Sequence, residues 1–128
     1  LKTTNECVSI FRDLLNSVKF NKKSIDRSLN LGFLTATDLA DYLTRQGVAF
    51  RDAHRITGKI ISYCETNDKN LDEVKIGEFK KFSKFIEKDI YKFISINHSV
   101  SSKNSYGGTS IKNVKKMLVQ YKRILSKL

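Results

Sequence analysis

Apolar residues recur every three or four positions along most of the chain, which is the pattern of amphipathic helices. The first run covers residues 1–19, where steps of three and four alternate as in a heptad seam. The seam consists of Leu1, Thr4, Val8, Phe11, Leu15 and Val18. A short helix gains little stability alone, so this seam needs a partner. Two arrangements stay open: an apolar seam that is left exposed or drives non-native association, or a helix packed on its own domain.

A second helix is expected from Asn21 to Leu31. Asn21 can cap its start, since an Asn side chain accepts a hydrogen bond from a first-turn amide. Ile25 and Leu29 form a narrow apolar face, and Gly32 ends the helix.

The clearest start and stop signals surround a third helix, Ala36–Gln46. Thr35 is a good N-cap, because its hydroxyl can accept a backbone N–H of the first turn. Asp38 lies three residues on, where its carboxylate can reach back and also meets the positive end of the helix dipole. Gly47 supplies the left-handed residue that ends such a helix.

A wide apolar face predicts a fourth helix over Arg51–Glu65. Gly58 lies inside it at a cost of about 1 kcal/mol relative to Ala, which indicates the close approach of another helix. The apolar face consists of Ala53, Ile56, Thr57, Ile60, Ile61 and Cys64.

The next elements are shorter. Asp72 can cap a short helical turn after the polar segment 66–70, and Lys75, which cannot cap, stands before a stripe that begins at Ile76. The stripe continues through Phe79, Phe82 and Phe85. A further helix is expected over Ile86–Ile96, with Ile86, Ile90, Phe93 and Ile94 facing inward.

Residues 97–109 are predicted to form a long polar segment that leads into a last helix, Ile111–Leu128. Gly107 and Gly108 allow a tight turn, after which Thr109 or Ser110 caps the helix. Amides at such a turn can hold an anion; the alternative is a loop that only turns the chain and caps the helix. The apolar stripe of the helix consists of Val114, Met117, Leu118, Tyr121, Leu125 and Leu128.

These patterns predict an all-α fold with six or seven helices and without sheet. The 128 residues suit one domain, and no apolar run is long enough to span a membrane. The chain starts at Leu1 rather than Met. We therefore expect a domain cut from a longer protein, or a processed piece.

The net charge of +11 is unevenly placed, since every acidic residue lies at or before Asp89. One-sided positive charge can indicate nucleic acid or another anionic partner. The alternative is compositional drift, because the chain is rich in Lys, Ile and Asn and poor in Arg. No aromatic or Arg cluster marks a base-reading face, so we do not expect nucleic acid.

No catalytic constellation emerges from the sequence. His54 and His98 lack a His or Cys partner at metal spacing, so we expect no metal. Neither Cys7 nor Cys64 belongs to a Cys-x-x-Cys pair, and free thiols are expected, with a disulfide as the alternative. No nucleophile motif and no Gly-rich phosphate-binding loop after a strand is present.

Three segments resemble the C-terminal domain of argininosuccinate lyases. They are Thr35–Leu43 (Thr-Ala-Thr-Asp-Leu-Ala-Asp-Tyr-Leu), Glu78–Tyr91, and Asn104–Thr109 (Asn-Ser-Tyr-Gly-Gly-Thr). The resemblance covers nearly the whole chain. The chain departs from the family pattern at Ala49 and Lys84, where the family has proline, and at Lys75, where it has serine.

The resemblance implies a cytoplasmic, cofactor-free enzyme, a homotetramer that cleaves argininosuccinate into arginine and fumarate in arginine biosynthesis. It implies that residues 1–19 are the end of a central bundle helix and that residues 20–128 are the C-terminal helical domain. The family's catalytic loop and histidine lie upstream of this region, so no catalytic residue is assigned here and the chain alone is expected to be inactive. Residues Thr35, Asp38, Gly47, Gly107, Gly108 and Thr109 are assigned to the structural motif.

Two alternatives to the enzyme stay open. One is a basic helical module that binds nucleic acid or another anionic partner. The other is a lyase-derived protein used structurally, as the lens crystallins of this family are.

Overall fold

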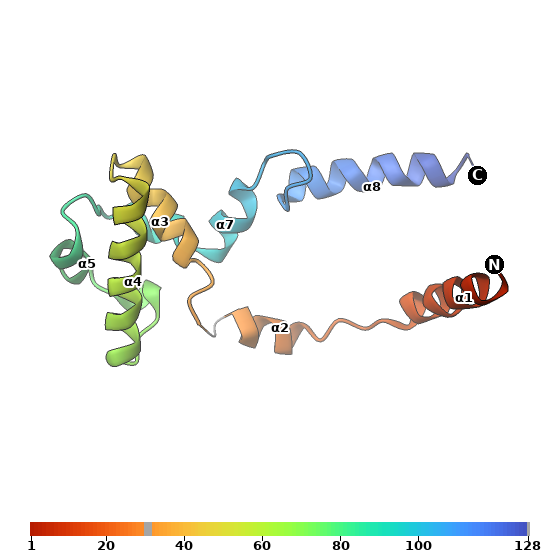
Figure 1. Cartoon of the computed structure of the whole chain (residues 1–128), viewed down its shortest axis with the longest axis horizontal. Coiled ribbons are helices and arrows are strands. Elements are labelled where there is room, and N and C mark those ends of the chain that lie inside the picture. The colour runs from red at the N-terminus through yellow and green to blue at the C-terminus, as the bar shows by residue number, and fades with distance from the viewer. Residues whose placement is uncertain (30–31, 128) are drawn as a thin grey trace. The chain divides into compact units, whose positions relative to one another are not determined.

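A computed structural model describes residues 1–29 and 32–127 of the chain. The all-α prediction is confirmed, but the predicted number of six or seven helices is too low. Within these residues there are eight α-helices, one 3₁₀ turn and no strand (Figure 1). The chain divides into two compact units, Leu1–Leu31 and Gly32–Leu128. The assignment of residues 1–19 to a bundle helix concerns a longer protein and stays a prediction.

The first unit contains helix α1 (Lys2–Ser17) and helix α2 (Lys22–Leu29). No residue of either helix is buried, and Val8, Phe11 and Leu15 of the heptad seam are exposed. Among the described residues of the first unit, the seam is therefore exposed. The side chain of Asn21 caps α2 by accepting a hydrogen bond from the Ser24 amide at 3.1 Å, as predicted. The expected end of the helix at Leu31 lies outside the described residues.

Helices α3 (Ala36–Arg45) and α4 (Phe50–Thr66) pack against each other and form the centre of the second unit (Figure 1). Their apolar faces are buried because each presents large side chains at helical spacing. The core cluster consists of Leu39, Tyr42, Leu43, Ala53, Ile60, Cys64, Leu71, Val74, Phe79, Ile86, Ile90 and Ile94.

The two ends of α3 differ in how well they match expectation. Gly47 has φ +90°, and the amides of Gly47 and Val48 bond to the carbonyls of Thr44 and Leu43 at 3.0 and 3.1 Å. This is the Schellman ending that a glycine at this position predicts. Thr35 is the N-cap residue, but the expected hydroxyl hydrogen bond is absent. With φ −95° and ψ 12°, Thr35 lies outside the extended conformation that a capping side chain needs.

Glutamates, rather than the expected residues, organise the short helices that follow. In the 3₁₀ turn η1 (Leu71–Glu73) the N-cap is Asn70, whose amide bonds to Glu73 Oε2 at 2.7 Å, so the prediction that Asp72 caps this turn is wrong. Helix α5 (Ile76–Phe82) starts after Lys75, whose amide bonds to Glu78 Oε2 at 2.7 Å. Each carboxylate three residues into its helix thus supplies a capping contact that the N-cap side chain lacks.

The prediction that another helix approaches Gly58 closely is wrong. Gly58 is exposed, and a Cβ added there would meet no atom within 4 Å. The glycine therefore has no packing role among the described residues.

The region around residue 96 also differs from expectation. Helix α6 (Ile90–Phe93) is only one turn long, although Ile86, Ile90 and Ile94 are buried as predicted. A separate helix α7 (Ile96–Ser102) occupies part of the segment expected to be a polar loop. It forms because the Ser95 side chain accepts the amide of His98 at 3.3 Å and caps a new helix.

The last helix, α8, covers Ile111–Leu125. Ser110, one of the two caps considered, accepts the Asn113 amide at 3.4 Å, whereas Thr109 is exposed and does not cap. No described residue of α8 is buried, and Leu128 of the expected stripe lies outside the described residues.

Candidate functional site

In the second unit, the Thr35–Leu43 segment contacts Lys103, the residue directly before the Asn104–Thr109 segment. Lys103 Nζ donates to Asp38 Oδ1 at 3.3 Å and forms an ion pair with it. Asp38, in the first turn of α3, is almost fully buried, whereas the Lys103 side chain is about half exposed. Asp38 therefore anchors the segment after α7 to α3, instead of capping its own helix as predicted.

Residues 103–110, here named the glycine loop, are held by hydrogen bonds within the loop. The amides of Gly108 and Ser110 donate to the carbonyls of Ser105 at 2.8 Å and Lys103 at 3.2 Å. Gly107 has φ +76°, which favours glycine, and a Cβ on Gly108 would collide with the Lys103 carbonyl oxygen. Both glycines are thus required by the path of the loop.

The same contacts bear on whether the glycine loop holds an anion. The amides of Gly108 and Ser110 already donate to carbonyls, and the Asn113 amide donates to the Ser110 hydroxyl. The Asn113 side chain also donates to the Ser105 carbonyl at 2.7 Å. The geometry accordingly fits a loop that turns the chain and caps α8, which is the structural alternative stated above.

A second polar cluster joins α4 to α5 through one carboxylate. Lys69 Nζ donates to Glu78 Oε1 at 2.8 Å, and the Tyr63 hydroxyl donates to the same oxygen. Hydrogen bonds from Lys69, Tyr63 and the Lys75 amide lower the pKa of Glu78 to about 2. The cluster therefore stabilises the contact between α4 and α5, since all its donors bond to Glu78.

A third polar contact lies against the core. The buried Tyr42 hydroxyl donates to Asp89 Oδ1 at 2.7 Å and accepts the Glu87 amide at 3.1 Å. Burial, and then the hydrogen bond to Asp89, raise the pKa of Tyr42. Sequence reasoning missed this contact because the partners are 47 residues apart and Tyr42 reads as an ordinary core aromatic.

The histidines and cysteines do not assemble into a reactive group. His54 is exposed on α4, as predicted, and His98 packs its ring 4.8 Å from that of Phe93. Cys7 is exposed and Cys64 is buried, both as free thiols, and burial raises the pKa of Cys64. Within residues 1–29 and 32–127, no three His, Cys, Asp or Glu side chains are grouped to hold a metal ion.

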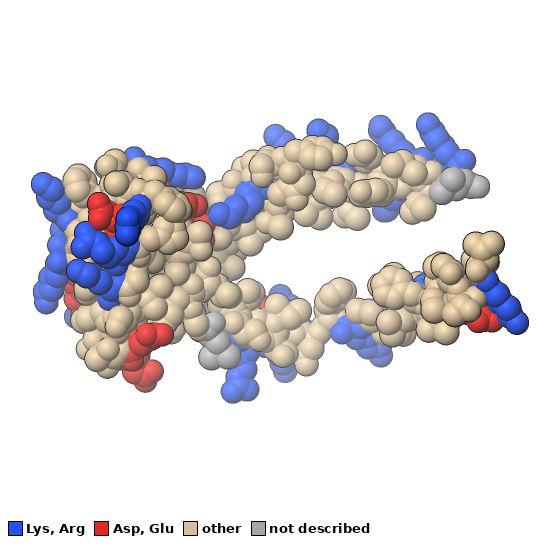
Figure 2. Space-filling view, in the orientation of Figure 1, with Lys and Arg blue, Asp and Glu red and all other residues tan. Residues whose placement is uncertain are grey.

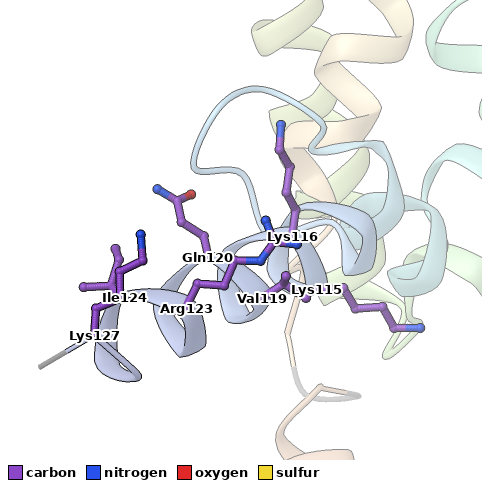
Figure 3. Close-up of a pocket in the computed structure, with 7 residues that line it drawn as sticks. All are labelled: Lys115, Lys116, Val119, Gln120, Arg123, Ile124 and Lys127. Carbon is purple, nitrogen blue, oxygen red and sulfur yellow. The ribbon is translucent and has the colours of Figure 1, made fainter.

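Helix α8 carries the strongest local charge. Lys and Arg side chains lie along it, and no acid occurs between residues 111 and 127 (Figure 2). Its basic face forms an open hollow of about 630 Å³. All seven lining side chains extend from this one helix (Figure 3): Lys115, Lys116, Val119, Gln120, Arg123, Ile124 and Lys127.

One buried polar atom escaped the sequence analysis. Thr57 faces the core of the second unit, and among the residues that the structure describes its hydroxyl has no hydrogen-bond partner. The sequence showed only a residue on an apolar face, because a buried hydroxyl is indistinguishable from a buried methyl in a hydrophobicity pattern.

The comparison with protein families decides what kind of chain this is. A model of the argininosuccinate lyase C-terminal family matches residues 33–101, which is more than half of the chain. The chain belongs to this family. The match starts just before the Thr35–Leu43 segment and ends in α7, so the argininosuccinate lyase C-terminal region includes α3 to α6.

Individual relatives extend the similarity to the ends of the chain. The argininosuccinate lyase of Caldicellulosiruptor bescii is 41% identical over 128 residues, which are all of this chain and 28% of that enzyme. The Caldicellulosiruptor saccharolyticus enzyme is 42% identical over 98% of this chain and 27% of its own length. That of Clostridium tetani is 44% identical over 77% of this chain and 23% of its own length. The chain therefore spans about a quarter of the length of these argininosuccinate lyases.

No helix in the described part of the chain has the length and apolar character needed to cross a membrane.

Proposed function

We propose that this chain is the C-terminal domain of an argininosuccinate lyase, which cleaves argininosuccinate into arginine and fumarate. The observation that carries the proposal is the similarity to argininosuccinate lyases along the whole chain, together with the family match over α3 to α6. Residues 1–19 then form the end of a central bundle helix, and residues 20–128 form the C-terminal domain.

The proposed reaction is a β-elimination. A base removes a proton next to a carboxylate, hydrogen-bond donors hold the carbanion, and an acid protonates the leaving guanidinium nitrogen. In this proposal the chain supplies none of these groups, since the family's catalytic loop and histidine lie upstream of the matching region. The contacts of Asp38, Glu78 and Asp89 within the fold support this. Its role is to complete the fold around an active site formed by the upstream part of the enzyme.

The same proposal includes the oligomeric state, the cellular location and the pathway of the parent protein. We infer a homotetramer in the cytoplasm that acts in arginine biosynthesis and the urea cycle, without a cofactor. The exposed heptad seam of α1 supports a helical assembly, since such a seam gains stability only by packing on other long helices.

A fumarate-release assay tests the proposal. The chain alone is compared with a chimera in which it replaces the matched C-terminal quarter of the Caldicellulosiruptor bescii enzyme. We expect fumarate release by the chimera at a rate near that of the parent enzyme and none by the chain alone. If the chimera folds but is inactive, the chain is related to lyases by ancestry only. Fumarate release by the chain alone would refute the inference that the active site lies upstream.

A second candidate function is binding of nucleic acid or another polyanion. The basic hollow of α8 favours it, since four cations line one face without an acid (Figure 3). This function predicts an affinity that falls steeply with salt and a preference among polyanions. A structural use like that of the lens crystallins predicts instead a folded chimera without activity.

A further inference from the structure

The apolar stripe of α8 takes no part in the core of its own unit. It consists of Val114, Met117, Leu118, Tyr121 and Leu125, all exposed, with Leu125 at 68%. The core cluster contains no residue of α8. Within the described residues, the start of the helix is held by the hydrogen bonds of Ser110 and Asn113.

A helix with an exposed apolar stripe needs a packing partner for that stripe. A 15-residue helix is marginal alone in water, and most helical stability in proteins comes from packing an apolar face. The stripe lies on the side of the helix opposite the basic hollow, because Val114 and Val119 are about 140° apart around an α-helix. The stripe and the basic face are thus distinct surfaces that border each other at Lys115.

The charges beside the stripe restrict which protein surface can pack on it. Lys115 and Lys122 lie along one edge of the stripe, and Asn113 and Gln120 lie along the other. The two lysines are seven residues, or about 10 Å, apart along the helix. A second copy of α8 is a poor cover, because each helix carries six Lys or Arg and no acid between residues 111 and 127. The suitable partner has an apolar groove with carboxylates along one edge only.

We propose that the apolar stripe of α8 docks on the upstream helical part of the same lyase, in a groove whose acidic edge faces Lys115 and Lys122. This inference rests on the proposed function, which makes the chain one quarter of a longer enzyme. The lyases of the two Caldicellulosiruptor species have about three quarters of their length outside the match, which is ample to supply such a groove.

Thiol labelling at two matched positions tests the docking. In a background with Cys7→Ser, Val114→Cys places a thiol in the stripe and Val119→Cys places one on the basic face. The two valines are similarly exposed, at 44% and 52%. We expect both thiols to react quickly in the chain alone. In the chimera, Val114→Cys should react at least about 10-fold more slowly, because labelling then requires local opening, while Val119→Cys keeps its rate.

A charge-reversal pair tests the acidic edge. In the chimera, Lys115→Glu with Lys122→Glu should restore fast labelling of Val114→Cys. The control, Lys112→Glu with Lys116→Glu, changes the same charge on the basic face and should leave the protection intact.

The outcomes separate this inference from the proposed function. An active chimera in which Val114→Cys reacts as fast as in the chain alone overturns the docking and leaves the lyase function standing. In an inactive chimera the labelling rates still decide the docking: protection of Val114→Cys supports it and fast reaction overturns it. Protection of Val114→Cys in the chain alone, by self-association or only with anionic lipid vesicles, assigns the stripe to a different partner and also overturns it.

Discussion

Glu78 joins three points of the second unit through one carboxylate. It accepts hydrogen bonds from Lys69 and Tyr63 and from the amide of Lys75. These donors hold its pKa at about 2, below the ordinary value of about 4.3. Because the folded-state pKa is the lower one, the contribution to stability is complete above about pH 5 and is lost as the pH falls toward 2.

We expect Glu78→Gln to lower the melting temperature at pH 7 and to flatten its decline between pH 5 and 2. Thermal unfolding followed by circular dichroism across this pH range measures both effects. Glu65→Gln, which removes an exposed carboxylate on α4, is the control and should leave the curve nearly unchanged. A Glu78→Gln profile parallel to that of the original chain would contradict a stabilising role of the ionised carboxylate.

Gly58 and Gly108 should respond to alanine in opposite directions. A Cβ at Gly58 meets nothing, so Gly58→Ala should raise the free energy of unfolding by about 0.5–1 kcal/mol through helix propensity and the unfolded chain. A Cβ at Gly108 collides with the Lys103 carbonyl, so Gly108→Ala should lower it by about 2 kcal/mol. Urea denaturation of the two variants measures both changes, and equal signs would contradict the contrast.

At the scale of elements, the ion pair between Asp38 and Lys103 connects α3 to the glycine loop. Lys103→Met should cost about 1 kcal/mol, because the pair is half exposed and a buried carboxylate is left without its cation. It should also speed hydrogen exchange at the Ser110 amide, which donates to the Lys103 carbonyl. Lys112→Met removes a charge from exposed α8 and serves as the control. If Lys103→Met leaves the hydrogen-exchange rate of the Ser110 amide unchanged, the glycine loop is stable without the ion pair.

The elements that the sequence predicted best are those with local signals. The end of α3 at Gly47 and the capping of α2 by Asn21 depend on residues within a few positions of each other. Helix α7 was missed because its serines resemble a loop in composition. In the structure, the hydroxyls of Ser101 and Ser102 bond to carbonyls three residues earlier, which makes them compatible with a helix.

Contacts between distant elements could not be predicted in the same way. The sequence identified Asp38 and the glycine loop separately, but 65 residues separate Asp38 from Lys103. Asp38 was assigned a local capping role because its spacing from Thr35 fits one, and the tertiary ion pair overrides that preference. The family resemblance, rather than periodicity, indicated that both segments belong to one structural unit.

At the scale of the whole molecule, the charge is divided along the chain. From Ile90 onward there are eight Lys or Arg and no acid. Four of these side chains, those of Lys115, Lys116, Arg123 and Lys127, line the open hollow, and all of its described lining comes from α8 (Figure 3). Such charge attracts polyanions without reading their sequence, since phosphate contacts carry no sequence information directly.

We therefore expect the chain alone to bind duplex DNA and heparin weakly, without sequence preference, and with affinity that falls steeply between 50 and 200 mM salt, by roughly 10-fold or more. Fluorescence anisotropy with two labelled duplexes of unrelated sequence measures this. Replacing Lys116 and Arg123 by Gln should weaken binding about as much as replacing Lys22 and Lys23, because both pairs remove two exposed charges. If one duplex bound far more tightly and only the Lys116 and Arg123 replacements abolished the difference, the hollow of α8 would be a specific nucleic-acid site. The positive charge would then be functional rather than a product of composition.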